Sequence, residues 1–158
     1  MRKLLKAFIG ISFIVYLFAL VVILFLRARG HHWMDISLFE YMERSSNFVP
    51  FKTIHQFITA YQNNRLNTEI LIENLFGNLI LFCPMGLYLP FYFRKLSKTF
   101  WFLLVMLILL FIVEATQIIT RRGSFDIDDF ILNMIGALIG FGIWKFVQKK
   151  VHTYFRRR

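Results

Sequence analysis

The sequence predicts an all-α polytopic membrane protein, a bundle of four transmembrane helices with a short interfacial amphipathic helix between the first and the second. Hydrophobic residues make up 58% of the 158-residue chain, and 20 residues are phenylalanine. Soluble proteins contain roughly 45–50% apolar residues, so this composition indicates a membrane protein. The apolar residues fall into four long runs separated by polar or basic segments. We expect residues 1–158 to form a single membrane domain.

The predicted transmembrane helices cover residues 7–26, 71–93, 99–119 and 126–147. Each run provides the roughly 20 helical residues that are needed to cross a bilayer. The first run is long for a signal peptide and ends in Arg27-Ala-Arg29 instead of a small-residue cleavage site, so we expect it to be retained. The second run contains Pro84, whose ring removes a backbone donor, and we expect a kink or a break there.

Residues 27–70 are too polar to span and are predicted to be an extracytoplasmic segment. After Pro50, a residue type common at the start of a helix, apolar side chains recur with helical spacing and polar side chains occupy the other face. The apolar positions are Phe51, Ile54, Phe57, Ile58 and Tyr61. This pattern predicts a short helix that lies in the membrane interface or packs on its own domain.

Basic residues indicate the orientation. They are dense at the amino terminus, between Arg94 and Lys98, and in a basic tail over residues 148–158, whereas residues 27–70 mix them with acids. The positive-inside rule therefore predicts a multi-pass membrane protein with both termini in the cytoplasm. In this orientation, the polar residues near the start of the second and fourth helices and the end of the third face outward.

Composition also argues against several classes of function. The formal charge of +10 lies beside the spans, so it gives no indication of nucleic-acid binding. The single cysteine, Cys83, rules out an intramolecular disulfide, and the histidines show no metal-ligand spacing. Ser124 and Thr116 have no neighbouring histidine for a serine-type triad. We expect no metal and no cofactor.

Polar residues interrupt the apolar sequence between residues 114 and 140. On a helix, Glu114, Gln117 and Arg121 share one face. After a turn at residues 120–125, a second helix places Asp126, Asp129, Asn133, Gly136 and Gly140 on one stripe. The second predicted span adds two amides near its start. The candidate ligand-binding residues are therefore Asn74, Asn78, Glu114, Gln117, Arg121, Arg122, Asp126, Asp129 and Asn133.

Two interpretations of these residues remain open, a site that binds a ligand and a set of polar contacts that joins helices. Interhelical hydrogen bonds contribute only about 0.6 kcal/mol on average, which favours a functional site. We expect Arg121 to pair with Glu114, and Arg122 with Asp126 or Asp129. Arginines suit phosphate or carboxylate, and carboxylates suit proton transfer, amines or a cation. The glycines at positions 136 and 140 form a GxxxG element, which we expect to pack against another helix.

The sequence resembles the VanZ-like family of bacterial membrane proteins in four ordered motifs: Asn47-Phe-Val-Pro-Phe51, Glu73-Asn-Leu-Phe-Gly-Asn78, Glu114-Ala-Thr-Gln117 and Arg122-Gly-Ser-Phe-Asp-Ile-Asp-Asp129. The family takes its name from an accessory protein of glycopeptide-resistance clusters that raises resistance to teicoplanin. The resemblance implies a plasma-membrane protein of a Gram-positive bacterium with a role in the envelope or in antibiotic tolerance. It implies no catalytic mechanism.

Three functions fit these observations, and whether the protein is an enzyme stays open. The favoured one is an accessory module that engages an envelope lipid or a cell-wall precursor from the extracytoplasmic side. The second is an intramembrane enzyme acting on a lipid-linked phosphate or ester, with Glu114 or an aspartate as general base. The third is a small oligomeric transporter. The bilayer itself is the one partner that all three require.

Overall fold

The structure of the protein is a computed structural model that describes residues 2–26, 36–65 and 67–156. Four of its helices are long and apolar enough to cross a membrane. These candidate spans are Lys6–Leu26, Leu71–Tyr92, Thr99–Ile119 and Ile127–Lys150. The predicted fold class, an all-α polytopic membrane protein, is confirmed.

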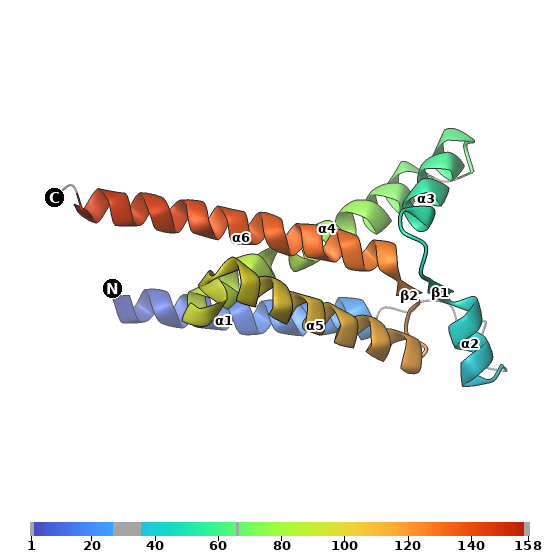
Figure 1. Cartoon of the computed structure of the whole chain (residues 1–158), viewed down its shortest axis with the longest axis horizontal. Helices are drawn as coiled ribbons and strands as arrows, with labels where there is room; N and C mark the ends of the chain where they lie inside the picture. Colours follow the sequence, from blue (N-terminus) through green and yellow to red (C-terminus); the bar gives the residue numbers. More distant parts are fainter. Residues whose placement is uncertain (1, 27–35, 66, 157–158) are drawn as a thin grey trace. The chain divides into compact units, whose positions relative to one another are not determined.

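The elements follow one another along the chain as coloured in Figure 1. They are α1 (Arg2–Val21), the π-helix η1 (Val22–Leu26), α2 (Leu38–Arg44), β1 (Ser46–Asn47), α3 (Lys52–Gln62), α4 (Thr68–Tyr92), the 3₁₀-helix η2 (Arg94–Ser97), α5 (Thr99–Ile119), β2 (Phe125–Asp126) and α6 (Ile127–Arg156). The two short strands pair with each other.

Most of the predicted boundaries agree with these elements. The helix α5 has the predicted bounds, and α3 is the amphipathic helix expected after Pro50. The helix α6 continues to Arg156, past the predicted end at residue 147, so much of the predicted basic tail is helical. The helix α2 was not predicted. The predictions for residues 27–35, 66 and 157–158 lie outside the described residues.

The helix α4 runs without interruption from Thr68 to Tyr92, with Pro84 and Pro90 inside it. Of the two expected alternatives at Pro84, this excludes the break, and the kink stays a prediction. A proline in a helix interior removes one backbone hydrogen bond and crowds the preceding turn. Membrane helices tolerate this because neighbouring groups satisfy the freed carbonyl.

The chain divides into two compact units. The first contains Met1–Ser46 and Glu114–Phe125, and the second contains Asn47–Val113 and Asp126–Arg158. In the first unit, the buried side chains include Leu20 and Leu24 near the end of the first span and Ile118 near the end of α5.

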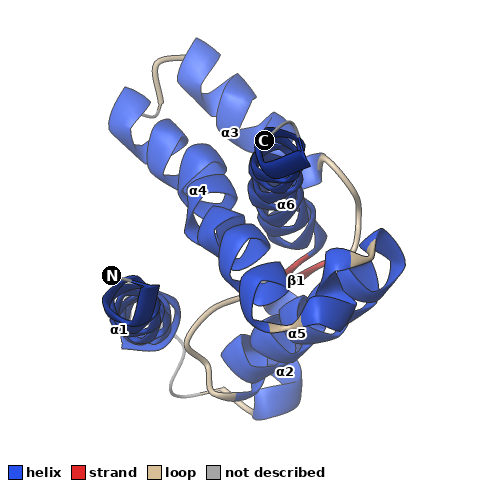
Figure 2. Ribbon diagram, turned by 90° about the vertical axis from the view of Figure 1, so that its left-hand side faces the viewer, coloured by secondary structure: helices blue, strands red, loops and turns tan. Residues whose placement is uncertain are grey.

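In the second unit, α4 packs against α6, and the two helices cross each other in Figure 1 and lie next to each other in Figure 2. The core contains Phe82 and Phe102, both with no exposed surface. The ring of Phe102 stacks on that of Phe141, with centroids 4.2 Å apart and planes 6° from parallel. The helix α3 lies beside the first turns of α4.

Candidate functional site

Glycines bring the backbones of α4 and α6 into direct contact. A Cβ atom added to Gly136 would lie within 3.0 Å of the Leu79 carbonyl oxygen, and one added to Gly140 would lie equally close to that of Cys83. On the other side, a Cβ atom on Gly86 would clash with the backbone of α6. The predicted packing role of Gly136-xxx-Gly140 is confirmed, and we call this backbone contact the glycine seam.

A polar group lies on the same stripe of α6 as the glycine seam. Asn78 on α4 donates a hydrogen bond from Nδ2 to Asp129 Oδ1 at 2.5 Å. Asn133 follows Asp129 by one helical turn and precedes Gly136 by another, so all three share one face of α6. We call Asn78, Asp129 and Asn133 the seam cluster.

The amide of Asn133 is the unusual member of the seam cluster. It is only 2% exposed, and its Oδ1 has no hydrogen-bond partner among the residues that the structure describes. A buried neutral acceptor without a partner costs about 1–3 kcal/mol. Native structures rarely leave such groups unsatisfied, and one that persists calls for an explanation such as a bound molecule.

Asp126 does not lie on the helical stripe that the sequence predicts. It belongs to β2 and precedes the first residue of α6, so this part of the prediction is wrong. Its Oδ1 accepts hydrogen bonds from Asn47 Nδ2 at 3.0 Å and from the backbone N–H of Asp128 at 2.9 Å. Its Oδ2 accepts one from Thr53 Oγ1 at 2.7 Å. The carboxylate therefore ties the start of α3 to the start of α6.

Asp128 caps α3 from a distant part of the chain. Its Oδ1 accepts from the backbone N–H of Phe51 at 2.5 Å, and its Oδ2 accepts from that of Ile54 at 3.0 Å. These are the N-cap and third N–H groups of α3, which lack partners within the helix. A carboxylate at this end also interacts favourably with the helix dipole. We call Asn47, Thr53, Asp126 and Asp128 the loop anchor.

In the first unit, Gln117 makes a structural contact with the π-helix. Its side chain is 3% exposed, and Nε2 donates to the Leu24 carbonyl in η1 at 3.1 Å. A π-helix leaves carbonyl groups outside the regular α-helical pattern, and Gln117 satisfies one of them within an apolar span. Glu114, one turn earlier in α5, is also buried, with 2% of its surface exposed.

Arg121 ends α5 in the left-handed region, with φ of 56°. The N–H of Arg121 bonds to the Ile118 carbonyl, and that of Arg122 bonds to the Gln117 carbonyl, which is the Schellman arrangement that usually takes glycine. The guanidinium of Arg121 lies 5.8 Å from the ring centroid of Tyr41, whose hydroxyl donates to the Gly123 carbonyl. Arg121 thus closes the end of α5 over α2.

The nine predicted site residues fall into both units. The second unit contains Asn74, Asn78, Asp126, Asp129 and Asn133, and the structure brings Asn78 together with Asp129. Asn74 is exposed on α4. The first unit contains Glu114, Gln117, Arg121 and Arg122, of which Arg122 is exposed. The expected pairs of Arg122 with Asp126 or Asp129, and of Arg121 with Glu114, stay predictions.

The candidate list missed Asn47, Thr53 and Asp128 of the loop anchor, as well as Tyr41. Asn47 and Asp128 belong to two of the four family motifs, but no sequence pattern indicates that segments about 80 residues apart are in contact. Within the described residues, no three His, Cys, Asp or Glu side chains come together in a group that could hold a metal ion.

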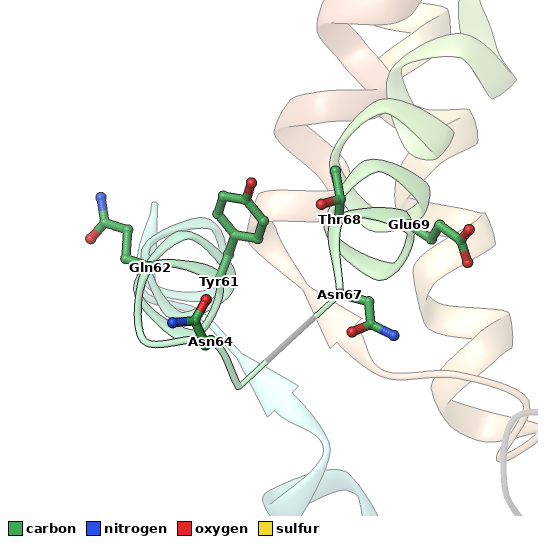
Figure 3. Close-up of a pocket in the computed structure, with 6 residues that line it drawn as sticks. All are labelled: Tyr61, Gln62, Asn64, Asn67, Thr68 and Glu69. Carbon is green, nitrogen blue, oxygen red and sulfur yellow. The ribbon is translucent and has the colours of Figure 1, made fainter.

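An open polar pocket lies between the end of α3 and the start of α4 (Figure 3). It is lined by Tyr61, Gln62, Asn64, Asn67, Thr68 and Glu69. All six residues are exposed. The pocket is therefore an open gap between two helix ends, and the predicted site residues do not line it.

The chain was compared with known proteins. A family model described as VanZ/LLP1 matches residues 13–148. The chain is similar to protein VanZ of Enterococcus faecium, with 31% identity over 117 residues, which cover 74% of this chain and 63% of that protein. The match thus spans less than two thirds of that relative's length. No solved structure matches the chain. Because the family model covers most of its residues, the chain belongs to the VanZ/LLP1 family.

Proposed function

We propose that the protein is an accessory factor of the bacterial envelope, and that the seam cluster binds the polar group of an envelope lipid or a cell-wall precursor. The observation that carries this proposal is the buried Asn133 oxygen without a hydrogen-bond partner. A ligand that donates a hydrogen bond there would offset the cost of about 1–3 kcal/mol that the empty acceptor imposes.

The chemistry of the seam cluster favours a ligand rich in hydrogen-bond donors. Asn133 presents an acceptor, and Asp129 presents a carboxylate, so an amine, a hydroxyl or an amide N–H is the complementary group. Such groups are abundant in lipid head groups and in lipid-linked sugars and peptides. The low dielectric of the surrounding span strengthens each of these hydrogen bonds.

The depth of the seam cluster supports a ligand held in the membrane. Asn78 lies seven residues into the span that begins at Leu71, which corresponds to about 10 Å of helix. The hydrocarbon core is about 30 Å thick, so the cluster lies in its outer third. A ligand that meets the cluster while it stays in the bilayer is therefore expected to be a lipid or a lipid-linked molecule.

We place the seam cluster on the extracytoplasmic side because the dense basic segments favour cytoplasmic termini. Single cysteines introduced at Arg44 and at Lys95 test this orientation in intact cells. We expect a membrane-impermeant thiol reagent to label the cysteine at position 44 and not the one at position 95. The opposite labelling pattern would overturn the outward orientation.

The resemblance to protein VanZ extends the proposal to a phenotype, tolerance of teicoplanin. The test compares cells that carry the parent chain with cells that carry Asp129→Asn, which keeps the shape and removes the charge. We expect the variant to reach normal membrane abundance and to lose both growth in teicoplanin and any lipid that co-purifies with the parent, measured by mass spectrometry. Gly142→Ala is the control, because a Cβ atom at Gly142 meets nothing within 4 Å.

Glu114 in the first unit is tested in the same assay by Glu114→Gln. If both neutral variants retain the phenotype and the lipid at normal abundance, the polar residues serve only helix packing and the proposal fails. If a lipid is recovered in chemically altered form from the parent and not from the variants, the protein is an enzyme instead of a binding module.

A further inference from the structure

Four consecutive apolar residues form an exposed turn between β1 and α3. Phe48 is 70% exposed, Val49 57% and Phe51 62%, and Pro50 between them is exposed as well. We call residues 48–51 the apolar tip. A run of exposed apolar residues outside a span is unfavourable in water, and it indicates a surface that something covers.

The backbone of the apolar tip is strained at Phe51. The Lys52 N–H bonds to the Val49 carbonyl at 3.3 Å, and Phe51 has φ of 64° and ψ of 3°. These values fit the third position of a type II turn, which normally takes glycine or asparagine. A residue with a side chain costs roughly 1–2 kcal/mol in this conformation. Because the Phe51 ring is largely exposed, packing inside the protein offsets little of this cost.

The loop anchor holds the apolar tip at one level of the molecule. Asp128 accepts hydrogen bonds from Phe51, the last residue of the tip, and from Ile54, three residues further on. Asp126 accepts one from Asn47, immediately before the tip. Both aspartates adjoin Ile127, the first residue of the fourth candidate span. The tip is therefore fixed at the depth where α6 enters the membrane.

The hydrogen bond between Asn78 and Asp129 relates this depth to α4. Asn78 lies seven residues into its span and Asp129 lies two residues into its own, and the two side chains are bonded. At 1.5 Å per residue, this bond puts the start of α6 about 7 Å inside the start of the α4 span, whereas the backbone contacts of the glycine seam put the two starts level to within about one residue. The apolar tip thus lies between the membrane surface and about 7 Å below it.

We propose that the apolar tip is inserted in the bilayer, where Phe48, Val49 and Phe51 contact the glycerol and upper acyl-chain region of the lipids. The adjacent Lys52 then lies just below the phosphate groups. Its side chain extends along the lipid, so that the amine reaches them. The energy of burying aromatic rings in the interface offsets the strained backbone at Phe51. This surface is separate from the seam cluster, and the proposal does not depend on a ligand there.

Site-directed fluorescence quenching tests the insertion. In a cysteine-free background made with Cys83→Ser, Val49→Cys is labelled with bimane and reconstituted in nanodiscs of phosphatidylcholine and phosphatidylglycerol. The matched control is Gln56→Cys, an exposed position on the polar face of α3. Nanodiscs made with brominated phosphatidylcholine quench labels in the lipid, and iodide quenches labels in water.

We expect brominated lipid to remove most of the fluorescence at position 49 and little of it at position 56, and iodide to do the reverse. Strong iodide quenching at position 49, equal to that at position 56, would overturn the proposal. Protection from both quenchers together with disulfide-linked dimers of Val49→Cys would also overturn it, because a second copy of the chain would then cover the tip.

Discussion

The carboxylates of Asp126 and Asp128 accept hydrogen bonds from the segment that leads into α3, whereas Asn133, about a turn and a half further along α6, has a buried oxygen without a partner. In sequence the three residues look alike, as polar groups at the start of an apolar helix. The difference between the loop anchor and the seam cluster separates polar groups that hold the fold from those that we propose to bind a ligand. A buried polar group with hydrogen-bond partners rigidifies its surroundings. A buried polar group without a partner destabilises the folded protein until a bound molecule supplies one.

The largest effect on stability is expected at the glycine seam, which positions the seam cluster. Gly140→Ala places a Cβ atom against the Cys83 carbonyl, a backbone group that cannot rotate away. We expect a loss at or above the upper end of the roughly 1–3 kcal/mol usual for overpacking. Thermal unfolding of the purified protein in detergent measures it. Gly142→Ala, which meets open space, should leave the melting temperature unchanged or raise it. Equal behaviour of the two variants would contradict close packing at the seam.

The next largest effect is expected in the loop anchor. Asp128→Ala removes the acceptor of two backbone N–H groups at the start of α3, and we expect a loss of about 2 kcal/mol. Asp128→Asn keeps one side-chain oxygen as an acceptor and should lie between the parent and the alanine variant. Unfolding measured through a fluorophore on α3 reports the change. An alanine variant as stable as its parent would show that this cap contributes nothing.

A smaller effect is expected at Thr53, which bonds through its hydroxyl to Asp126 at 2.7 Å. Thr53→Val keeps the shape and loses this hydrogen bond together with the one that Oγ1 accepts from Asn47 Nδ2 at 3.1 Å, so we expect a loss of about 1.5 kcal/mol in the same unfolding assay. Thr59→Val, two turns later in α3, controls for the intrinsic effect of valine in a helix. The anchor hypothesis requires the loss at position 53 to exceed that at position 59.

The smallest effect on stability is expected at Asn133, where the comparison between the two regions is sharpest. Asn133→Leu removes the buried acceptor without a partner, so stability should stay within about 1 kcal/mol of the parent or rise. Growth in teicoplanin and lipid co-purification should nevertheless be lost if the amide binds a ligand. An Asn133→Leu variant that unfolds at a clearly lower temperature and keeps its phenotype would show that Asn133 holds the fold and does not bind a ligand.

Sequence patterns located the helices well because membrane spans depend on long apolar runs. The bounds of α5 followed from its apolar run, and the position of α3 followed from Pro50 and apolar periodicity. The break at Pro84 did not occur, since a proline costs a single hydrogen bond that a membrane helix can lose without ending. The short helix α2 has no comparable apolar stripe and escaped prediction.

Only part of the candidate site was predicted, because some of its contacts join segments that are far apart in the sequence. Helical spacing placed Asp129, Asn133 and the two glycines on one stripe, and the contacts of Asp129 and of the glycines with α4 agree with it. Asp126 was assigned to the same stripe because its spacing fits, but its bonds to Asn47 and Thr53 hold it outside the helix. Such pairings join segments far apart in sequence, and local periodicity carries no information about them.

The glycine seam also constrains how this chain tolerates substitution. The helix α6 contributes bare Cα atoms, and at Leu79 and Cys83 the helix α4 contributes carbonyl oxygens. Every residue type has a carbonyl, so the contact itself does not select the residue at position 79 or 83, while it permits nothing larger than a hydrogen atom at positions 136 and 140. At these points the close contact thus depends on the glycines of α6 and not on the side chains of α4. A chain in which Cys83 is replaced should therefore keep the same register between the two helices.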